Sequence, residues 1–413
     1  MRIWLINHYA VPPQYYPLAR QTYFAKNLMA MGHKVTIISA SSVHNSDKNL
    51  ITDGSRWKRE SVDGVDHVYI KCCDYKDNGI KRIYNMCEFA WKLPGVCKKL
   101  EKPDAIVSTS MPPMSCAKGI KLAKKFGVPG VAEIADLWPE SLIAYQIAGP
   151  RNPAVLYLRR LEKWIYKRSD AIVFTMGGGY DYIRDMHWER EISKDKVMHI
   201  NNGIDLEMFD YNAEHYKISD PDLEDGQTVK VVYTGSLRHA NEQIKPLFDA
   251  IELMQTQAYA RFRFFIYGKG EMQEELERLC KEKHLNNVKM KGYVEKKYIP
   301  YILSKCSIAI LNCKSHEILR YGGSQNKLFD YLASGISVIS GEDNPYSIVR
   351  NRNCGIAQDF RTAQELVNAL RQLSEHPIDR GYIRSIAKEY DFSVLSKSLL
   401  DIINRCLRAK GET

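Results

Sequence analysis

Residues 1–40 read MRIWLINHYAVPPQYYPLARQTYFAKNLMAMGHKVTIISA and contain a strand, a loop, a helix and a second strand in order. The apolar run Ile3–Ile6 predicts the first strand, and Lys34–Ser39 predicts the second. Between them, the amphipathic pattern of Gln21–Met31 predicts a helix that ends at Gly32, which makes a βαβ unit with parallel strands. The alternation continues and predicts a doubly wound parallel α/β sheet. Its further strands are expected at Ala105–Ser108, Gly130–Ile134, Ala171–Phe174 and Lys196–Ile200.

The length of the chain predicts a second domain. A chain of 413 residues with 45% hydrophobic composition is too long for one ordinary core and suits two domains of roughly 200 residues each. The acidic, turn-rich stretch 206–228 predicts a linker between N-terminal (1–205) and C-terminal (229–385) Rossmann-like domains, whose sheets face across a cleft. Residues 386–413 predict a helical segment that can cross back to the N-terminal domain. The C-terminal strands are expected at Val229–Thr234, Arg263–Tyr267, Val288–Lys291, Ile308–Leu311 and Ser337–Ile339.

The composition indicates the cellular compartment of the protein and the charge of its partners. The first strand follows Met1 without the basic and apolar regions of a signal peptide, and no apolar run approaches the roughly 18 residues of a membrane-spanning helix. The ten cysteines are scattered without a Cys-x-x-Cys pair, which favours reduced thiols and a cytoplasmic protein. A formal charge of +10 favours an anionic partner, and it does not choose among nucleic acid, acidic lipid and a phosphorylated ligand.

The segment with the most specific chemistry is 322–335, GGSQNKLFDYLASG. It predicts a glycine-rich loop, a polar N-cap and a short helix that ends at Gly335. The free N–H groups of such a helix start favour an anion, and Lys327 adds a positive charge that suits a diphosphate. Asp330 lies on the same face about 4.5 Å further along, where its carboxylate could hold ribose hydroxyls. An ordinary surface helix with a lysine and an aspartate three residues apart would show the same pattern.

Several segments, in order, resemble family 4 retaining glycosyltransferases, particularly the bacterial surface-polysaccharide branch. Ser324–Tyr331 is similar to the donor-binding motif of that branch. Each of the other matching segments is short, and together they cover nearly the whole chain: Gly32–Val35, Asp136–Ser141, Asn202–Asp205, Tyr233–Arg238, Ile266–Gly270 and Lys291–Val294.

The resemblance implies a GT-B fold, with the nucleotide held mainly by the C-terminal domain and the acceptor mainly by the N-terminal one. It implies that Arg238 and Lys327 pair with the donor diphosphate, that Asp330 holds the ribose, and that the backbone of Gly292, Tyr293 and Val294 contacts the base. Two cations and helix-dipole amides can stabilise the leaving diphosphate, so we expect no metal and no cofactor. The remaining donor-loop candidates are Gly235, Gly268, Gly323, Ser324 and Asn326.

One Asp-x-Asp sequence, Asp220-Pro221-Asp222, could suggest a metal site. It lies in the expected linker, where a proline turn between two acidic residues is the simpler interpretation.

The chain departs from the family pattern at the donor site. The family has two glutamates eight positions apart, where this chain has Gly322 and Asp330. Six positions after Gly235 the family has a lysine, where this chain has Asn241. We therefore expect Arg238 to neutralise the leaving group with less help, and we expect altered contact with the donor sugar.

The N-terminal half departs as well. The loop that carries paired glycines in the family reads Pro17-Leu18-Ala19-Arg20, in which Arg20 could compensate and contribute to acceptor binding. The strand that ends in a histidine in many relatives is Gly130–Ile134 here. The catalytic candidates that could face the reacting sugar are Asp136, as the first choice, and Glu133, as the second, together with Arg238 and Lys327. A helix cap is the alternative role for Asp136.

His8 and its neighbour Tyr9 follow the first strand and are candidate acceptor-binding residues, because ligands lie beyond the carboxyl ends of parallel strands. A structural histidine would fit the same position.

Two segments of the N-terminal half combine basic and aromatic residues, namely 81–99 and 157–168. Arg159, Lys163 and Lys167 recur at helical spacing and make one basic face, which could lie on anionic lipid headgroups. A solvated helix whose tryptophan and tyrosine pack inward is the alternative.

These observations predict a metal-independent hexosyl- or N-acetylhexosaminyltransferase that moves a sugar from a nucleotide-diphosphate donor, with UDP favoured. The acceptor is a lipid-linked sugar or a saccharide in capsule, O-antigen or exopolysaccharide biosynthesis, and the enzyme is peripheral on the inner face of the plasma membrane. The resemblance implies same-face attack without a covalent glycosyl-enzyme. The alternatives are a nucleotide-sugar 2-epimerase and a non-catalytic nucleotide-sugar-binding or scaffold protein; nucleic-acid binding rests on charge alone.

Overall fold

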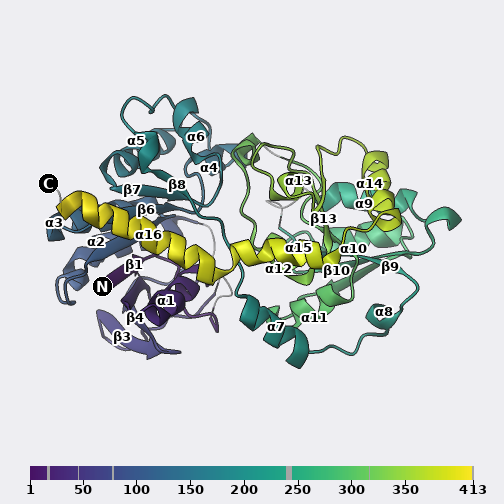
Figure 1. Cartoon of the computed structure of the whole chain (residues 1–413), viewed down its shortest axis with the longest axis horizontal. Helices are drawn as coiled ribbons and strands as arrows, with labels where there is room; N and C mark the ends of the chain where they lie inside the picture. The colour runs from purple at the N-terminus through teal and green to yellow at the C-terminus, as the bar shows by residue number, and fades with distance from the viewer. Residues whose placement is uncertain (16–18, 45, 77–78, 239–243, 316, 412–413) are drawn as a thin grey trace. The chain divides into compact units, whose positions relative to one another are not determined.

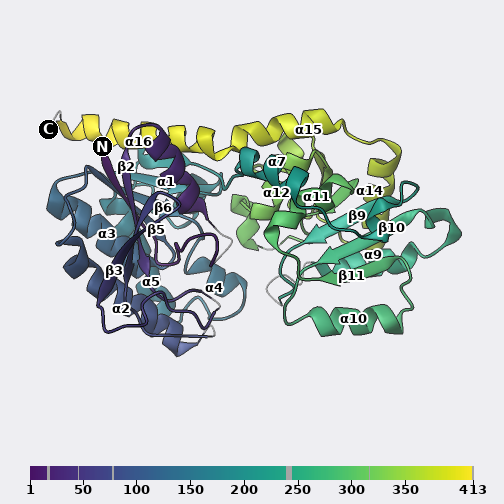
Figure 2. The same ribbon diagram turned by 90° about the horizontal axis from the view of Figure 1, so that it is seen from below.

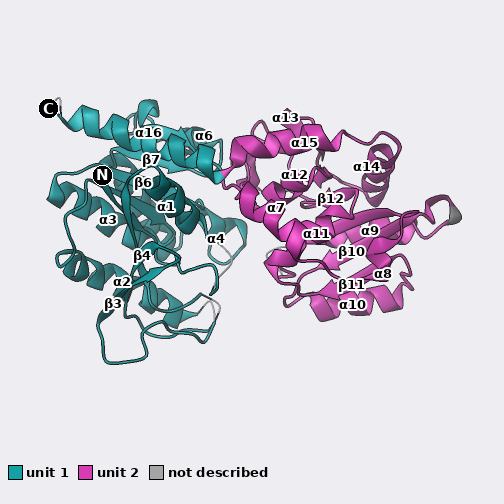
Figure 3. Cartoon of the chain, turned by 60° about the horizontal axis from the view of Figure 1, so that its bottom comes forward, with its two compact units in different colours: residues 1–201, 392–413 teal, residues 202–391 magenta. Residues whose placement is uncertain are grey.

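The computed structural model describes the chain except residues 16–18, 45, 77–78, 239–243, 316, 412–413 and the side chain at position 257. The chain divides into two compact units, shown in Figure 3. Unit 1 contains residues 1–201 and 392–413, and unit 2 contains residues 202–391. Both are Rossmann-like α/β folds with largely parallel sheets, as the sequence predicts.

Unit 1 is built on an eight-stranded sheet with the order β3-β4-β2-β1-β5-β6-β7-β8. β3 pairs antiparallel with β4, and the other neighbouring strands pair in parallel. The strand order reverses direction at β1, which is the position where ligands bind in doubly wound folds. The strands are β1 (Arg2–Ile6), β2 (Lys34–Ala40), β3 (Trp57–Val62), β4 (Val65–Ile70), β5 (Ala105–Ser110), β6 (Gly130–Ile134), β7 (Ala171–Phe174) and β8 (Val197–His199).

Helices cover both faces of this sheet because successive strand residues point to opposite sides. Ile3 and Leu5 of β1 belong to a core shared with α1 and α16, and Trp4 and Ile6 belong to a core shared with α2 and α3. Figures 1 and 2 show α1 and α16 side by side within this unit. The helices are α1 (Arg20–Ala30), α2 (Ile80–Cys97), α3 (Pro113–Phe126), α4 (Glu140–Ala144), α5 (Pro153–Arg168), α6 (Gly179–Asp185), η1 (Lys194–Lys196) and α16 (Phe392–Gly411).

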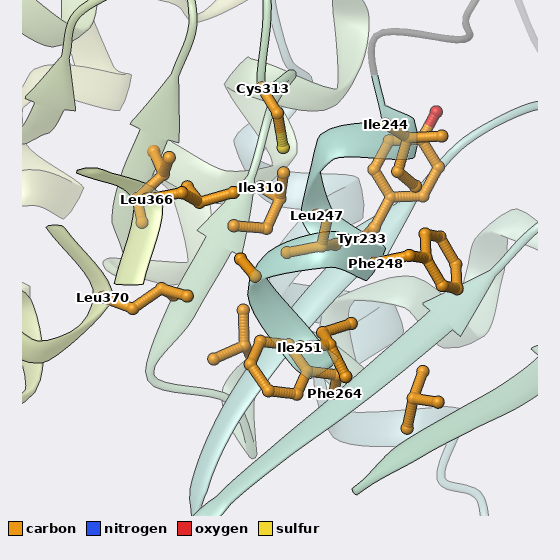
Figure 4. Close-up of a cluster of buried hydrophobic side chains, with 14 of the residues drawn as sticks. Tyr233, Ile244, Leu247, Phe248, Ile251, Phe264, Ile310, Cys313, Leu366 and Leu370 are labelled. Carbon is orange, nitrogen blue, oxygen red and sulfur yellow. The ribbon is translucent and has the colours of Figure 1, made fainter. Parts of the chain in front are cut away.

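Unit 2 is built on a six-stranded parallel sheet with the order β11-β10-β9-β12-β13-β14. Figure 4 shows one face of it, where Leu247 and Phe248 of α9 and Leu366 of α14 pack with Tyr233 of β9 and Phe264 of β10. The strands are β9 (Val229–Thr234), β10 (Phe262–Tyr267), β11 (Val288–Gly292), β12 (Ile308–Ile310), β13 (Ser337–Ser340) and β14 (Gly355–Ala357).

The opposite face of this sheet is covered by α11, α12 and α15, with Val232 of β9 in the shared core. The helices of unit 2 are α7 (Leu206–His215), α8 (Pro221–Glu224), α9 (Lys245–Leu253), η3 (Gln257–Tyr259), α10 (Gln273–Glu282), η4 (Lys296–Tyr298), α11 (Ile299–Ser304), η5 (Glu317–Tyr321), α12 (Asn326–Ser334), α13 (Ile348–Asn351), α14 (Ala363–Glu375), α15 (Arg380–Ala387) and η6 (Lys388–Tyr390).

The stretch 206–228 is not a free linker. It forms α7 and α8, and Phe209 and Leu223 are buried in the core of unit 2. Asp205 begins α7 by accepting a hydrogen bond from the Met208 N–H. The acidic composition that suggested a linker belongs to exposed positions of these helices, while a few apolar side chains attach them to the core.

The carboxylates of Asp220 and Asp222 both pair with Lys291 of β11, at 2.8 Å each. Asp220 also begins α8 by accepting a hydrogen bond from the Asp222 N–H. Their role is therefore structural, as the proline-turn interpretation proposes. Among the residues that the structure describes, no group of three or more His, Cys, Asp and Glu side chains is arranged to hold a metal ion.

The end of the chain returns to unit 1 at Phe392, six residues later than the expected start of the helical segment at 386. The Phe392 ring stacks on Tyr23 of α1 at 4.8 Å, and Lys410 pairs with Asp170 at 3.1 Å. α15 and η6 remain in unit 2. Within the described ranges, no helix combines the length and the apolar character needed to cross a membrane.

Candidate active site

The start of α12 is the centre of the candidate donor site in unit 2. Buried side chains on one face of the helix, including Phe329 and Tyr331, attach it to the sheet, and Gly335 ends it with a left-handed φ of 69°. Gln325 occupies the N-cap position, but its side chain makes no cap hydrogen bond. Instead, its Nε2 donates to Oε1 of Glu342 at 2.7 Å. The expected polar cap is therefore absent at this end. The Leu328 N–H donates to the Gln325 carbonyl at 3.0 Å, and the Asn326 and Lys327 amides stay available to an anion.

Asn202 holds the loop before α12 in place. Its backbone N–H donates to Ser324 Oγ at 2.7 Å, and its Nδ2 donates to the Ser324 carbonyl at 2.6 Å. Both residues belong to unit 2. The sequence segment 202–205 thus contributes to the donor loop by positioning it.

Lys327 lies in the first turn of α12 with its Nζ 4.1 Å from the centroid of the Tyr233 ring. It forms no hydrogen bond or ion pair with any described residue. Desolvation lowers the pKa of this lysine to about 7, against the opposing effects of Cys313 and Glu342. A bound phosphate would restore the charged form, so the site is prepared to gain a proton together with an anion.

Asp330 lies one turn further along α12 and is largely buried. Its carboxylate has no hydrogen-bond or ion-pair partner within the described part of the chain, and desolvation raises its pKa while nearby Lys296 lowers it. Its oxygens are not among the fully buried polar atoms without a partner, so a ligand hydroxyl can reach this carboxylate.

The loops after β9, β10 and β11 lie next to one another at the carboxyl edge of the sheet. The Leu237 N–H donates to the Lys269 carbonyl at 3.0 Å, and the Gly268 N–H donates to the Gly292 carbonyl at 2.8 Å. A Cβ at Gly268 would lie 1.8 Å from the Gly235 carbonyl oxygen, so these backbones can approach only because the residues are glycines.

The other donor-site candidates follow from these loops. Arg238 is half-buried and directly precedes the undescribed residues 239–243, so Asn241 lies outside the described structure. Tyr293 is exposed and its ring lies 4.7 Å from Lys269 Nζ. Asn326 begins α12, and Val294 packs against the unit 2 core. The predicted donor residues are thus gathered at one edge of one sheet.

In unit 1, Glu133 and Arg20 are brought together as a buried ion pair. Arg20 Nε lies 2.8 Å from Glu133 Oε1, and the glutamate side chain is 3% exposed. Its Oε2 accepts hydrogen bonds from Gln21 Nε2 at 3.0 Å and Thr109 Oγ1 at 2.7 Å. The Arg20 guanidinium also donates to the carbonyl of Ile200 at 3.0 Å. This network ties α1 to the sheet, which favours a positioning role over contact with a sugar.

His8 is completely buried at the end of β1. Its ring lies edge-on to Phe89, with the ring centroids 5.0 Å apart, and burial lowers its pKa to about 3. Neither ring nitrogen has a hydrogen-bond partner among the described residues, so the acceptor role of His8 stays a prediction beside the structural one. Tyr9 is half-buried, and its hydroxyl accepts a hydrogen bond from Arg82 Nη2 at 2.9 Å.

Asp136 follows β6 and is exposed. The N-cap of α4 is Pro139, so Asp136 does not cap that helix. Its carboxylate forms no hydrogen bond or ion pair to the residues with described positions, which leaves it free for a ligand.

The basic face of α5 is paired within unit 1. Arg159 Nε lies 2.6 Å from Glu140 Oε1, while Lys163 and Lys167 share Glu191 at 2.5 and 2.7 Å. The three cations share two carboxylates, so part of the positive charge is paired, and the lipid-binding role of this face stays a prediction.

Two family models match the chain. Residues 21–208 match the model described as Glycosyltransferase Family 4, and residues 228–376 match the model described as Glycosyl transferases group 1. The chain is a glycosyltransferase similar to family 4. No curated protein sequence matches the enzyme.

Solved structures share the fold of this glycosyltransferase over nearly its whole length. Sucrose-phosphate synthase from Thermosynechococcus elongatus has a TM-score of 0.69 and 16% identity, covering 99% of this chain and 100% of its own. HepE from Anabaena, in complex with UDP, has a TM-score of 0.67 and 11% identity, covering 98% and 100%. WaaG, a glycosyltransferase involved in lipopolysaccharide biosynthesis, has a TM-score of 0.63 and 13% identity, covering 97% and 99%. The predicted GT-B fold is confirmed.

The glycosyltransferase has one candidate site residue that the sequence motifs missed. Glu342 follows β13 and is 4% exposed, and its Oε1 accepts hydrogen bonds from Asn312 Nδ2 at 2.9 Å and Gln325 Nε2 at 2.7 Å. Ligands bind beyond the carboxyl ends of parallel strands, which is why His8 is a candidate. The same rule could have predicted Glu342, which follows β13. Only the fold shows that this strand end lies beside α12.

Proposed function

We propose that the protein is a retaining glycosyltransferase that moves a sugar from a UDP-sugar to a lipid-linked or saccharide acceptor in cell-surface polysaccharide biosynthesis. The observation that carries the proposal is the uncapped start of α12, where Lys327 and Asp330 are both without partners among the described side chains. The UDP bound in HepE supports the choice of nucleotide.

The donor diphosphate binds at the first amides of α12 and at Lys327, with Arg238 as the second cation. Charge builds on the diphosphate as the glycosidic bond breaks, and preorganised donors stabilise it most strongly when they are already desolvated. The proposal requires no metal ion. Asp330 accepts hydrogen bonds from the ribose, and the backbone of 292–294 lies against the base.

The transfer exchanges two bonds at the anomeric carbon. The bond to the phosphate oxygen breaks, the bond to the acceptor oxygen forms on the same face, and the acceptor proton passes to the departing phosphate oxygen. We assign Asp136 to a contact with the reacting hexosyl or N-acetylhexosaminyl group. Glu133 and Arg20 position the carboxyl end of β6 from which Asp136 extends.

The acceptor proposal includes a membrane surface at the cytoplasmic face. Along α2, the residues at successive turns of one side are exposed apolar groups: Ile80 (84%), Ile83 (55%), Tyr84 (62%) and Trp91 (76%). Exposed lysines at 81, 98 and 99 flank this stripe. Apolar side chains with adjacent cations suit a bilayer interface with anionic headgroups.

The donor proposal is tested by calorimetric binding of UDP, GDP and ADP, with and without EDTA, to the wild type, Lys327→Ala and Asp330→Ala. We expect UDP to bind most tightly and to be indifferent to EDTA, and both variants to lose most of the binding. Lys281→Ala removes an exposed lysine of the same unit and serves as the control. Equal binding by all four proteins, or no binding by the wild type, would contradict the proposal.

A further inference from the structure

Glu342 has an unusual environment for a buried carboxylate. Asn312 and Gln325 both donate to its Oε1, which sets the orientation of the group. Its Oε2 has no hydrogen-bond partner in the part of the chain that the structure describes. Oε2 is not among the fully buried polar atoms without a partner, so it is open to water or a ligand.

The free oxygen lies against the glycine loop that precedes α12. A Cβ at Gly323 would lie 2.7 Å from Glu342 Oε2 and 3.0 Å from Oε1. The backbone of Gly323 has no left-handed φ, so its conformation alone would accept alanine. What requires glycine at this position is the space that the carboxylate occupies.

Glu342 also lies near Lys327, the candidate cation for the donor diphosphate, without forming an ion pair with it. Lys327 lowers the pKa of Glu342, and Glu342 raises the pKa of Lys327, but no ion pair joins the two residues. Desolvation outweighs this attraction and raises the pKa of Glu342 overall. The site thus holds Lys327, a cation for the diphosphate, near Glu342, an acceptor for hydroxyl groups, without an ion pair between the two.

The sequence lacks the first glutamate of the family pattern, because position 322 is glycine. We propose that Glu342 replaces it, reaching the same loop from the end of β13 and accepting a hydrogen bond from a hydroxyl of the donor sugar through Oε2. Glu342 is then a specificity-determining residue that distinguishes a nucleotide sugar from the free nucleotide. This inference rests on the proposed function of the α12 site.

The test compares the affinity for UDP with that for UDP-glucose, UDP-galactose and UDP-N-acetylglucosamine in the wild type, Glu342→Gln and Gly323→Ala. The gain is the ratio of the UDP Kd to the Kd of the best UDP-sugar. We expect both variants to lose about tenfold or more of the gain, the effect of removing a hydrogen bond to a charged group, and Glu342→Gln to keep binding UDP. Gly323→Ala reaches the same result by displacing the carboxylate.

The outcomes separate the two proposals. A structural role for Glu342 would weaken UDP and UDP-sugar by the same factor and leave the gain unchanged, which would overturn the inference while the donor site stands. A wild type that gains nothing from any of the three sugars would overturn it too. A wild type that binds no UDP would instead overturn the proposed function.

Discussion

Glu133 in unit 1 and Glu342 in unit 2 are both buried carboxylates at or just beyond the carboxyl end of a parallel strand, and they have opposite surroundings. Both oxygens of Glu133 are bonded, one of them to the charged Arg20. Glu342 receives two neutral amide donors on one oxygen and none on the other among the described residues. The comparison indicates that a saturated buried carboxylate holds the fold together, whereas a half-satisfied one beside an unpaired lysine is available for a ligand.

The largest expected effect comes from removing the cation that pairs with Glu133. Arg20→Met leaves Glu133 buried without its cation, which should lower the free energy of unfolding by about 3–5 kcal/mol. Urea denaturation measures this, and Arg160→Met, which alters an exposed arginine on α5, is the control with an expected change below about 0.5 kcal/mol. Because the Arg20–Glu133 ion pair belongs to unit 1 and the candidate donor site to unit 2, the UDP affinity of the folded variant should be unchanged. A loss of UDP affinity without loss of stability would show that Arg20 contributes to the donor site and not only to the fold of unit 1.

The second effect concerns Lys327 in the candidate donor site. Lys327→Ala should lower kcat/KM by about 100-fold or more, the usual cost of removing a preorganised donor to a leaving group. Its stability should not fall in proportion, because this lysine has no ion pair to lose within the described structure. Steady-state kinetics and thermal unfolding of the same samples give both numbers. A large fall in melting temperature with normal kcat/KM would assign Lys327 to the fold.

A third test uses the lowered pKa of Lys327. Since the pKa of Lys327 is about 7 in the folded protein, against an ordinary value of 10.5 for lysine, the unfolded chain binds the additional proton between these pH values. The contribution of this group to stability therefore increases as pH rises from about 7 to 10.5, and Lys327→Met should remove that component. Phosphate binding has the opposite requirement, so UDP affinity should fall above about pH 7, by up to about tenfold per unit. Calorimetry in buffers of different ionisation enthalpy should detect proton uptake with UDP, and its absence would contradict the assignment.

The smallest effect concerns the surface of unit 1. Ile83→Ser with Trp91→Ser should reduce sedimentation with vesicles containing phosphatidylglycerol by several-fold, because two exposed apolar groups of α2 are removed. Lys163→Gln, on α5, should have a smaller effect because Lys163 is paired with Glu191, which it shares with Lys167. Equal binding to vesicles with and without anionic lipid would argue against the membrane proposal.

The sequence predicts strands and helix ends correctly where the deciding residues are neighbours in the chain. The strand patterns at 3–6, 130–134 and 229–234 correspond to β1, β6 and β9, because apolar runs of that length have few other uses in an α/β fold. Gly335 predicted the end of α12, because a left-handed residue is needed there. The stretch 206–228 was misjudged as a linker, since composition does not reveal that Phe209 and Leu223 find buried positions.

The sequence by itself determined two Rossmann-like folds and the glycine-rich helix start with Lys327 and Asp330, because hydrophobic period, helix ends and charge at a helix N-terminus are properties of neighbouring residues. Tertiary structure decided which polar groups are free. Only packing brings Arg20 to Glu133, 113 positions away, and Gln325 to Glu342, and only packing buries His8 and leaves Asp136 exposed. Whether a carboxylate is saturated or open to a ligand depends on partners from distant strands, and that information exists only after the chain has folded.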